Sequence, residues 1–255
     1  MSPNSVGLPL LIGIGLFLGL VACDSGGGPP GPEMKEGKIT INSVRDLRKI
    51  GTDASFPLDA DYLLVEDIDA SGTSTLNGGT GFQPIATSGD AFRGTFDGNG
   101  FMISGLTINR PDADSVGLFA ATRGARINNL TLTEMNVRGG GTVGGLVGTS
   151  TVTELSEVEV HGAVKATGPE TGGMAGDWNG GVIANSSADV SVEAEYEYTG
   201  GLVGENENGE IRTSTASGPV RGSSFVGGLA GSSKGRSAGR AQIVQCLARG
   251  DVFGT

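Results

Sequence analysis

The side chains best suited to acid–base chemistry in this sequence are few. His161 is the only histidine, and it stands between Val160 and Gly162 with no serine or cysteine partner at a recurring spacing. A general base needs a partner group within hydrogen-bond reach, so His161 is interpreted as a surface or turn residue. Without a histidine cluster or paired cysteines there is no zinc motif, and no cofactor, metal or catalytic residue is expected.

Acidic residues suggest calcium at one point in the chain. Asp67-x-Asp69-x-Ser71-Gly72 begins like a calcium-binding loop, but the twelfth position is Gly78 rather than the bidentate glutamate that such a loop requires. The motif is therefore not predicted to bind calcium.

Further carboxylates recur at one position of a repeated unit. Asp177 belongs to one unit, and Glu205 and Glu207 belong to the next. Some β-helical polysaccharide lyases hold calcium in this way, but the aligned Arg123 and Lys234 lie one or more units away. The pattern favours a solvated acidic face over a catalytic site.

Aromatic residues form the candidate ligand-contact surface. Aligning successive units places Tyr198 beside Phe225, with Tyr196 nearby and Trp178 on another corner loop. Exposed rings can stack on sugars, and the tyrosine hydroxyls can form hydrogen bonds. The same rings could instead form a ladder that covers a turn.

Most of these candidate residues lie within a repeated sequence motif, which determines their positions in the fold. Glycine-flanked hydrophobic pairs recur with steps of 28, 28, 28 and 27 residues. The equivalent glycines are Gly117, Gly145, Gly173, Gly201 and Gly228. Short β-branched runs, too rich in glycine for helices, follow at constant offsets and fit strands with alternate side chains facing inward. The sequence thus predicts an all-β chain, a right-handed parallel β-helix with coils of about 28 residues.

The motif resembles a known family. Gly-Gly-Leu-Val-Gly at 200–204, followed by Ile211-x-x-Ser214-x-Ala216 and Val220, is similar to the GLUG repeat of bacterial surface proteins. Segments such as 41–47, 61–69 and 92–100 are similar to the lead-in coils of such proteins. The resemblance implies a non-enzymatic, adhesin-like binding or spacer module at the cell surface. Its alternatives are a carbohydrate-active β-helix enzyme, or the accessory region of a longer surface peptidase or adhesin of which this chain is a fragment.

The N-terminal region is organised for export. Residues 1–22 carry no charged side chain and end Leu20-Val21-Ala22-Cys23, which resembles the lipobox of a bacterial lipoprotein signal peptide. The resemblance implies lipidation of Cys23 and a membrane-anchored lipoprotein at the cell envelope or surface; an uncleaved anchor is the alternative. Residues 23–37 would then form a flexible Gly/Pro tether. Residues 38–116 would form a cap and lead-in coils, and residues 117–255 the repeats.

The two ends of the solenoid are expected to differ. Ser43 to Asp46 has a helix-capping pattern and Gly51 follows as a stop, which predicts a short helix that covers the first coil. No polar capping segment follows Val252, so this end is expected to be uncapped and open to an end-to-end contact.

Composition limits the partners. The formal net charge of −11 argues against nucleic acid as a partner and leaves a surface glycan or a protein. With Cys23 lipidated, Cys246 has no disulfide partner and is predicted to be a small buried hydrophobic residue.

Overall fold

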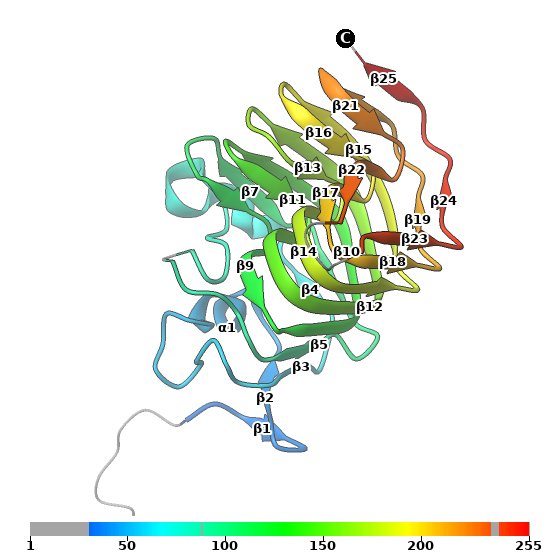
Figure 1. Cartoon of the computed structure of the whole chain (residues 1–255). Helices are drawn as coiled ribbons and strands as arrows, with labels where there is room; N and C mark the ends of the chain where they lie inside the picture. The colour runs from blue at the N-terminus through cyan, green and yellow to red at the C-terminus, as the bar shows by residue number, and fades with distance from the viewer. Residues whose placement is uncertain (1–30, 88, 236–239, 255) are drawn as a thin grey trace, which may run out of the picture. The chain divides into compact units, whose positions relative to one another are not determined.

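Alternating burial along the longest strand shows how this sequence builds its fold. In β12 (Val147–Ala166), exposed Glu154 lies between buried Thr153 and Leu155, and exposed Glu159 lies between buried Val158 and Val160. Period-two alternation is what a strand with one dry face requires. The computed structural model, which describes residues 31–87, 89–235 and 240–254, repeats this pattern as a parallel β-solenoid of about six turns of about 28 residues (Figure 1).

Most strands belong to one sheet that winds around the solenoid. The lead-in strands are β1 (Met34–Lys35), β2 (Lys38–Ile41), β3 (Tyr62–Leu64), β4 (Ile68–Asp69), β5 (Thr95–Asp97), β6 (Met102–Ser104) and β7 (Thr107–Arg110). The repeats contribute β9 (Phe119–Arg123), β10 (Arg126–Gly139), β12, β14 (Ala175–Ala184), β15 (Ser187–Ala194), β17 (Val203–Glu207), β18 (Glu210–Arg212), β19 (Thr215–Ala216), β20 (Val220–Gly222), β22 (Ala230–Lys234), β23 (Gln242–Val244), β24 (Leu247–Ala248) and β25 (Val252–Gly254).

A second, smaller sheet is formed by the short strands that lead into each glycine-rich motif. Its strands are β8 (Ser115–Val116), β11 (Thr142–Gly144), β13 (Thr171–Gly172), β16 (Glu197–Gly200) and β21 (Ser224–Gly227). They pair in parallel, each with the equivalent strand of the next coil.

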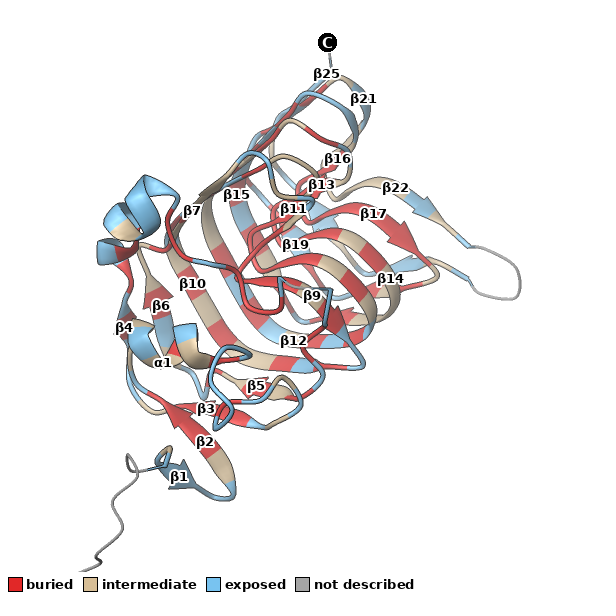
Figure 2. Ribbon diagram, turned by 90° about the vertical axis from the view of Figure 1, so that its left-hand side faces the viewer, coloured by how far each residue is buried: buried red, intermediate tan, exposed pale blue. Residues whose placement is uncertain are grey.

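The register confirms the predicted columns. Ile127 pairs with Leu155, Leu155 with Ile183, Ile183 with Ile211, and Ile211 with Ile243. Leu146, Met174 and Leu202 are fully buried in one core, and Leu229 packs against it from a partly buried position. Figure 2 shows the buried residues as stripes that repeat from strand to strand.

Left-handed residues shape the corners of the coils. Asn129, Glu157, Asn185, Thr213 and Gln245, which follow one another along the solenoid, have φ between 49° and 56°. Such a residue bulges the strand and turns the chain without breaking the inward pattern on either side.

The predicted cap is confirmed at the N-terminal end. Helix α1 (Val44–Lys49) begins at Ser43, whose side chain accepts a hydrogen bond from the Asp46 backbone N–H, and buries Leu47. A 3₁₀ segment, η1 (Ser71–Gly79), occupies the stretch that separates β4 from β5. Four aromatic rings then fill the first coils, with centroid distances of 5.0 to 6.0 Å from Tyr62 through Phe92 and Phe119 to Phe96.

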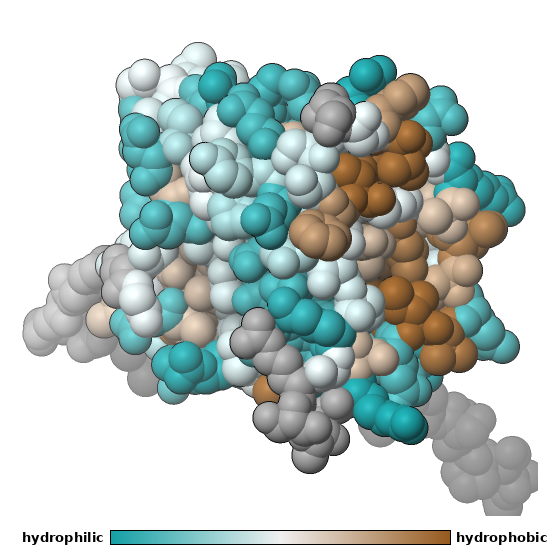
Figure 3. Space-filling model, turned by 45° about the horizontal axis from the view of Figure 1, so that its top comes forward, coloured by the Kyte–Doolittle hydropathy of each residue, from teal (hydrophilic) through white to brown (hydrophobic). Residues whose placement is uncertain are grey.

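The C-terminal coil is more exposed than the coils before it. Val220 is 0% exposed, whereas its partner in the next coil, Val252, is 44% exposed. Ile243, Val244, Leu247 and Phe253 are likewise 41–43% exposed. Figure 3 shows hydrophobic surface gathered toward one side of the face in view. Within the described residues, no helix is long and apolar enough to cross a lipid bilayer.

Candidate functional site

The exposed aromatic side chains lie on two neighbouring coils. Thr199 of β16 pairs with Val226 of β21, which sets Tyr198 beside Phe225. The two rings are stacked, with centroids 5.1 Å apart and planes inclined by 26°. Phe225 is 62% exposed, and Tyr196 is 58% exposed. The predicted neighbour relation is confirmed, and Tyr196, Tyr198 and Phe225 are called the aromatic patch below.

Both stacked residues sit on strained backbone. Tyr198 has a φ of 57° and Phe225 a φ of 51°, in the left-handed region that favours glycine. A bulky residue held there costs about 1–3 kcal/mol and persists only where the surrounding structure fixes it. Thr199, directly after Tyr198, is fully buried and paired on both sides, which supplies that constraint. The same conformation recurs at Glu170, the equivalent residue of the preceding coil, so it belongs to this turn of the solenoid, which carries a half-buried Tyr198 and an exposed Phe225.

Trp178 does not belong to this surface, which corrects the expectation from the sequence. It lies in β14 and is 0% exposed. Asp177 and Asn179 lie on the face of β14 that points away from the core and are only partly buried, so strand alternation turns the residue between them toward the core. The indole also fills the space beside Gly209, where an added Cβ would lie 2.4 Å from it.

The acidic residues are buried rather than solvated, which is a second correction. Glu205 and Glu207 of β17 are 4% and 7% exposed. On the next coil, Lys234 pairs in register with Glu207 and places its Nζ 3.2 Å from Glu207 Oε1. The same Nζ forms an ion pair with Glu205 Oε1. A buried carboxylate requires such a partner, because leaving water without one is strongly unfavourable.

Lys234 connects this carboxylate cluster to the aromatic patch. Its Nζ lies 5.4 Å from the centroid of the Tyr198 ring. A cation at this distance is attracted by the ring quadrupole. One lysine thus forms ion pairs with two carboxylates and also lies against the ring of Tyr198.

Asp177 extends the cluster to the preceding coil, where it pairs in register with Glu205. Burial raises the pKa of Asp177 to about 7, and repulsion from Glu170, Glu207 and Glu205 adds to the increase, while Lys234 opposes it. The carboxyl is therefore largely protonated below neutral pH.

The raised pKa predicts a pH-dependent stability. Because the folded state holds the proton of Asp177 more tightly than the unfolded state, the contribution of Asp177 to stability is complete below about pH 4 and is lost as the pH rises through about 7. Asp177→Asn removes the ionisable group and is expected to stabilise the protein at pH 8 by about 1–2 kcal/mol, allowing for solvent screening, with little change at pH 4. Urea midpoints at both pH values measure this.

Asp112→Asn is the control for that experiment, because Asp112 is exposed. A gain for Asp177→Asn that is the same at pH 4 and pH 8 would contradict the ionisation argument.

The other candidates identified in the sequence have structural roles. Asp67 Oδ1 accepts from the Met102 backbone N–H, and Asp69 Oδ1 accepts from the Ser71 backbone N–H, both at 2.9 Å. These contacts explain the acidic motif without calcium. In the part of the chain that the structure describes, no group of three or more His, Cys, Asp or Glu side chains could hold a metal ion.

The single histidine lies on the surface, as predicted. His161 has a side chain 40% exposed, with Nε2 3.7 Å from Glu159 Oε2. Cys246 is partly buried against the core, and its Sγ donates to the Val244 carbonyl at 3.3 Å. Cys23 lies outside the described residues.

Comparisons with known proteins agree with the repeat. The family model of the GLUG motif matches residues 195–220, which include Tyr196, Tyr198, Glu205 and Glu207. The chain therefore carries a GLUG motif within a β-solenoid, as the resemblance implied.

Two relatives match parts of the chain. Halomucin from Haloquadratum walsbyi is 45% identical over 154 residues, which is 58% of this chain and 2% of halomucin. A protein described as a Gly-rich membrane protein, from Evansella cellulosilytica, is 40% identical over 74 residues, which is 28% of this chain and 8% of that protein. The chain thus spans only a small part of the length of these relatives.

A solved structure shares the fold. A protein from Bacteroides ovatus described as an immunoglobulin A1 protease superposes with a TM-score of 0.73 and 18% identity, covering 89% of this chain and 70% of that one. At this identity the likeness concerns the fold alone.

Proposed function

We propose that this chain is a non-enzymatic, membrane-anchored surface β-helix that binds a surface glycan or protein in the manner of an adhesin. The aromatic patch carries the binding part of this proposal. Tyr198 and Phe225 form a stacked pair that reaches the surface, with Phe225 62% exposed, and the pairing of β16 with β21 holds both residues in place. Stacked rings beside a tyrosine hydroxyl suit the apolar face and the hydroxyl groups of a sugar.

The rigid coil supports a binding role. Tyr198 and Phe225 are fixed by the pairing of β16 with β21 and by Lys234 beneath the tyrosine ring. When the binding surface is already rigid, little binding free energy is lost in ordering its side chains. Without a ligand, the same rigid coil would serve as a spacer that holds other segments away from the membrane.

A glycan array tests the binding proposal. Wild-type protein is expected to bind a subset of neutral or cationic glycans, since the exposed Glu193, Glu195 and Glu197 stand next to Tyr196 and Tyr198 along the chain. Tyr198→Ala should reduce the signal about tenfold or more, as expected on removal of one stacking ring and hydroxyl. Tyr62→Phe is the control, because its ring is buried in the core.

An array signal that Tyr198→Ala and Phe225→Ala leave unchanged would exclude the aromatic patch as the binding surface. If the protein bound neither the glycans nor a panel of surface proteins, the binding proposal would be rejected and the spacer role would remain. Anchoring is tested separately: palmitate labelling of wild type that is lost in Cys23→Ser supports a lipoprotein, and equal labelling rejects it.

A further inference from the structure

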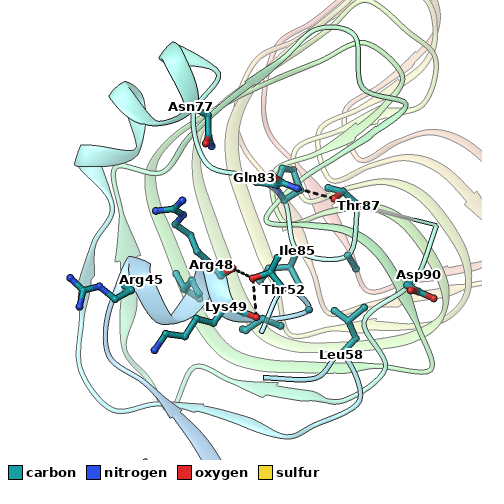
Figure 4. Close-up of a pocket in the computed structure, with 15 residues that line it drawn as sticks. Arg45, Arg48, Lys49, Thr52, Leu58, Asn77, Gln83, Ile85, Thr87 and Asp90 are labelled. Carbon is teal, nitrogen blue, oxygen red and sulfur yellow. Dashed lines mark hydrogen bonds between the residues drawn. The ribbon is translucent and has the colours of Figure 1, made fainter. Parts of the chain in front are cut away.

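A cavity lies at the N-terminal end of the solenoid, away from the aromatic patch. It has a volume of about 450 Å³, within the range of small-molecule sites. Figure 4 shows it between helix α1, Leu58 and the segment around Ile85. Residues that line it include Arg48, Thr52, Leu58, Gln83, Ile85 and Thr87.

The floor of the cavity is apolar and fixed. Leu47, Ile50 and Ile85 are at most 2% exposed and belong to the core. Gly51 follows the helix with a φ of 75°, and an added Cβ there would meet Leu58 at 2.6 Å, so Leu58 packs closely over this turn. The floor thus offers a preformed apolar surface.

One wall carries a cation that pairs with no residue in the described part of the chain. Arg48 is exposed and forms no ion pair with any described residue. Figure 4 shows its side chain extending from α1 toward Asn77, which also lines the cavity, while Arg45 and Lys49 point in other directions. Lys49 is already paired with Asp46 at 2.8 Å. In a chain with a net charge of −11, an unpaired guanidinium beside an apolar cavity favours an anionic ligand.

The rim supplies hydrogen-bonding groups. Gln83 Nε2 donates to Thr87 Oγ1 at 3.3 Å, a long bond that a ligand hydroxyl could replace. Thr52 donates its hydroxyl proton to the Arg48 carbonyl at 2.6 Å, which leaves its oxygen as an acceptor. Asp90 adds a carboxylate acceptor on the far side.

We propose that this cavity binds a hexuronate, either the free sugar acid or a terminal residue of an acidic glycan. The carboxylate of the sugar would pair with Arg48, its hydroxyls with Gln83, Thr52 and Asp90, and its C–H face with Ile85 and Leu58. This site is independent of the aromatic patch, whose acidic surroundings disfavour anions.

Titration of the full-length protein with D-glucuronate, followed by NMR, tests the proposal. Saturable shifts with a dissociation constant of about 1 mM or below are expected, with binding to neutral D-glucose at least about tenfold weaker. Affinity should fall as salt rises, because an exposed ion pair is screened. Arg48→Gln should weaken glucuronate binding about tenfold or more, and Gln83→Ala should weaken it several-fold.

Arg126→Gln is the matched control, since Arg126 is an exposed arginine on a later coil. Equal binding of glucuronate and glucose, or no saturable shift up to about 20 mM glucuronate, would overturn the proposal. Binding that both Arg48→Gln and Gln83→Ala leave unchanged would also overturn it. Both residues are exposed, and circular dichroism verifies that the variants fold. A heparin-type or polyuronate polymer compared with the monomer distinguishes a glycan terminus from the free acid.

Discussion

Replacing Lys234 by methionine is expected to destabilise the protein by about 2–3 kcal/mol, because it leaves two buried carboxylates without a cation. Glu205 and Glu207 are 4% and 7% exposed, and Lys234 is their cation on the next coil. This value lies below the range of about 3–5 kcal/mol for a broken buried ion pair, because the lysine side chain itself is 37% exposed. A shift in the urea midpoint measures the loss.

The matched control is Lys165→Met. Lys165 pairs with Glu193 at 2.7 Å across neighbouring coils, but their side chains are 43% and 55% exposed. A solvated pair contributes about 0–1 kcal/mol, so this variant should hardly change the midpoint. Equal effects of the two substitutions would show that burial of the carboxylates does not set the requirement for Lys234.

The second large effect is expected from Gly204→Ala, at about 3 kcal/mol. A Cβ on Gly204 would lie 2.5 Å from the backbone carbonyl carbon of Glu170 and 2.5 Å from the backbone nitrogen of Thr171. Backbone of the preceding coil cannot rotate away as a side chain can, so the two coils must separate. The last glycine of the Gly-Gly-Leu-Val-Gly phrase is thus required by close approach of neighbouring coils.

Gly72→Ala provides the comparison. Nothing lies within 4 Å of an added Cβ at Gly72, and its φ is not in the left-handed region. This substitution should change stability by less than about 0.5 kcal/mol. If Gly204→Ala were equally silent, the contact between coils at this position would be looser than described.

The regular coils could be predicted from the sequence because one rule determines them. Leu155 stands 28 residues after Ile127 and 28 before Ile183, and each pairs in register with the next. A column that stays apolar at a fixed period has a single arrangement that buries it. The capping helix was also predictable, since Ser43 and Asp46 give a local signal that needs no tertiary contact.

The two wrong predictions, for Trp178 and for the acidic residues, concern burial that neither the local sequence nor the repeat period determines. The sequence pattern predicts Trp178 on a corner loop, yet its strand continues through Gly180 and turns the indole inward. Burial of Glu205 and Glu207 depends on the second sheet that covers β17, which the repeat alone does not reveal. Lys234 could have been placed by counting, since it follows Ala230 by four residues as Glu207 follows Val203.

The N-terminal cavity could not be predicted for a different reason. Arg48 lies on α1, whereas Gln83 and Ile85 come from a segment outside the repeats. Only the tertiary packing of the lead-in region brings these segments together. No spacing rule links them.

The aromatic patch and the carboxylate cluster both depend on parallel, in-register stacking that places residues about 28 positions apart side by side. Cysteine cross-linking tests this stacking most directly. Lys165 pairs with Glu193, and Glu193 with Arg221, in three successive coils. Adjacent strands lie about 4.8 Å apart, within the Cα range of a disulfide, whereas alternate coils lie about 10 Å apart, beyond it.

In a background carrying Cys23→Ser and Cys246→Ser, the pair Lys165→Cys and Glu193→Cys is expected to oxidise to an intramolecular disulfide. The pair Lys165→Cys and Arg221→Cys is expected to remain reduced. Peptide mass spectrometry without reductant identifies the bond. A disulfide in the second pair but not in the first would contradict the stacking and every neighbour relation that follows from it.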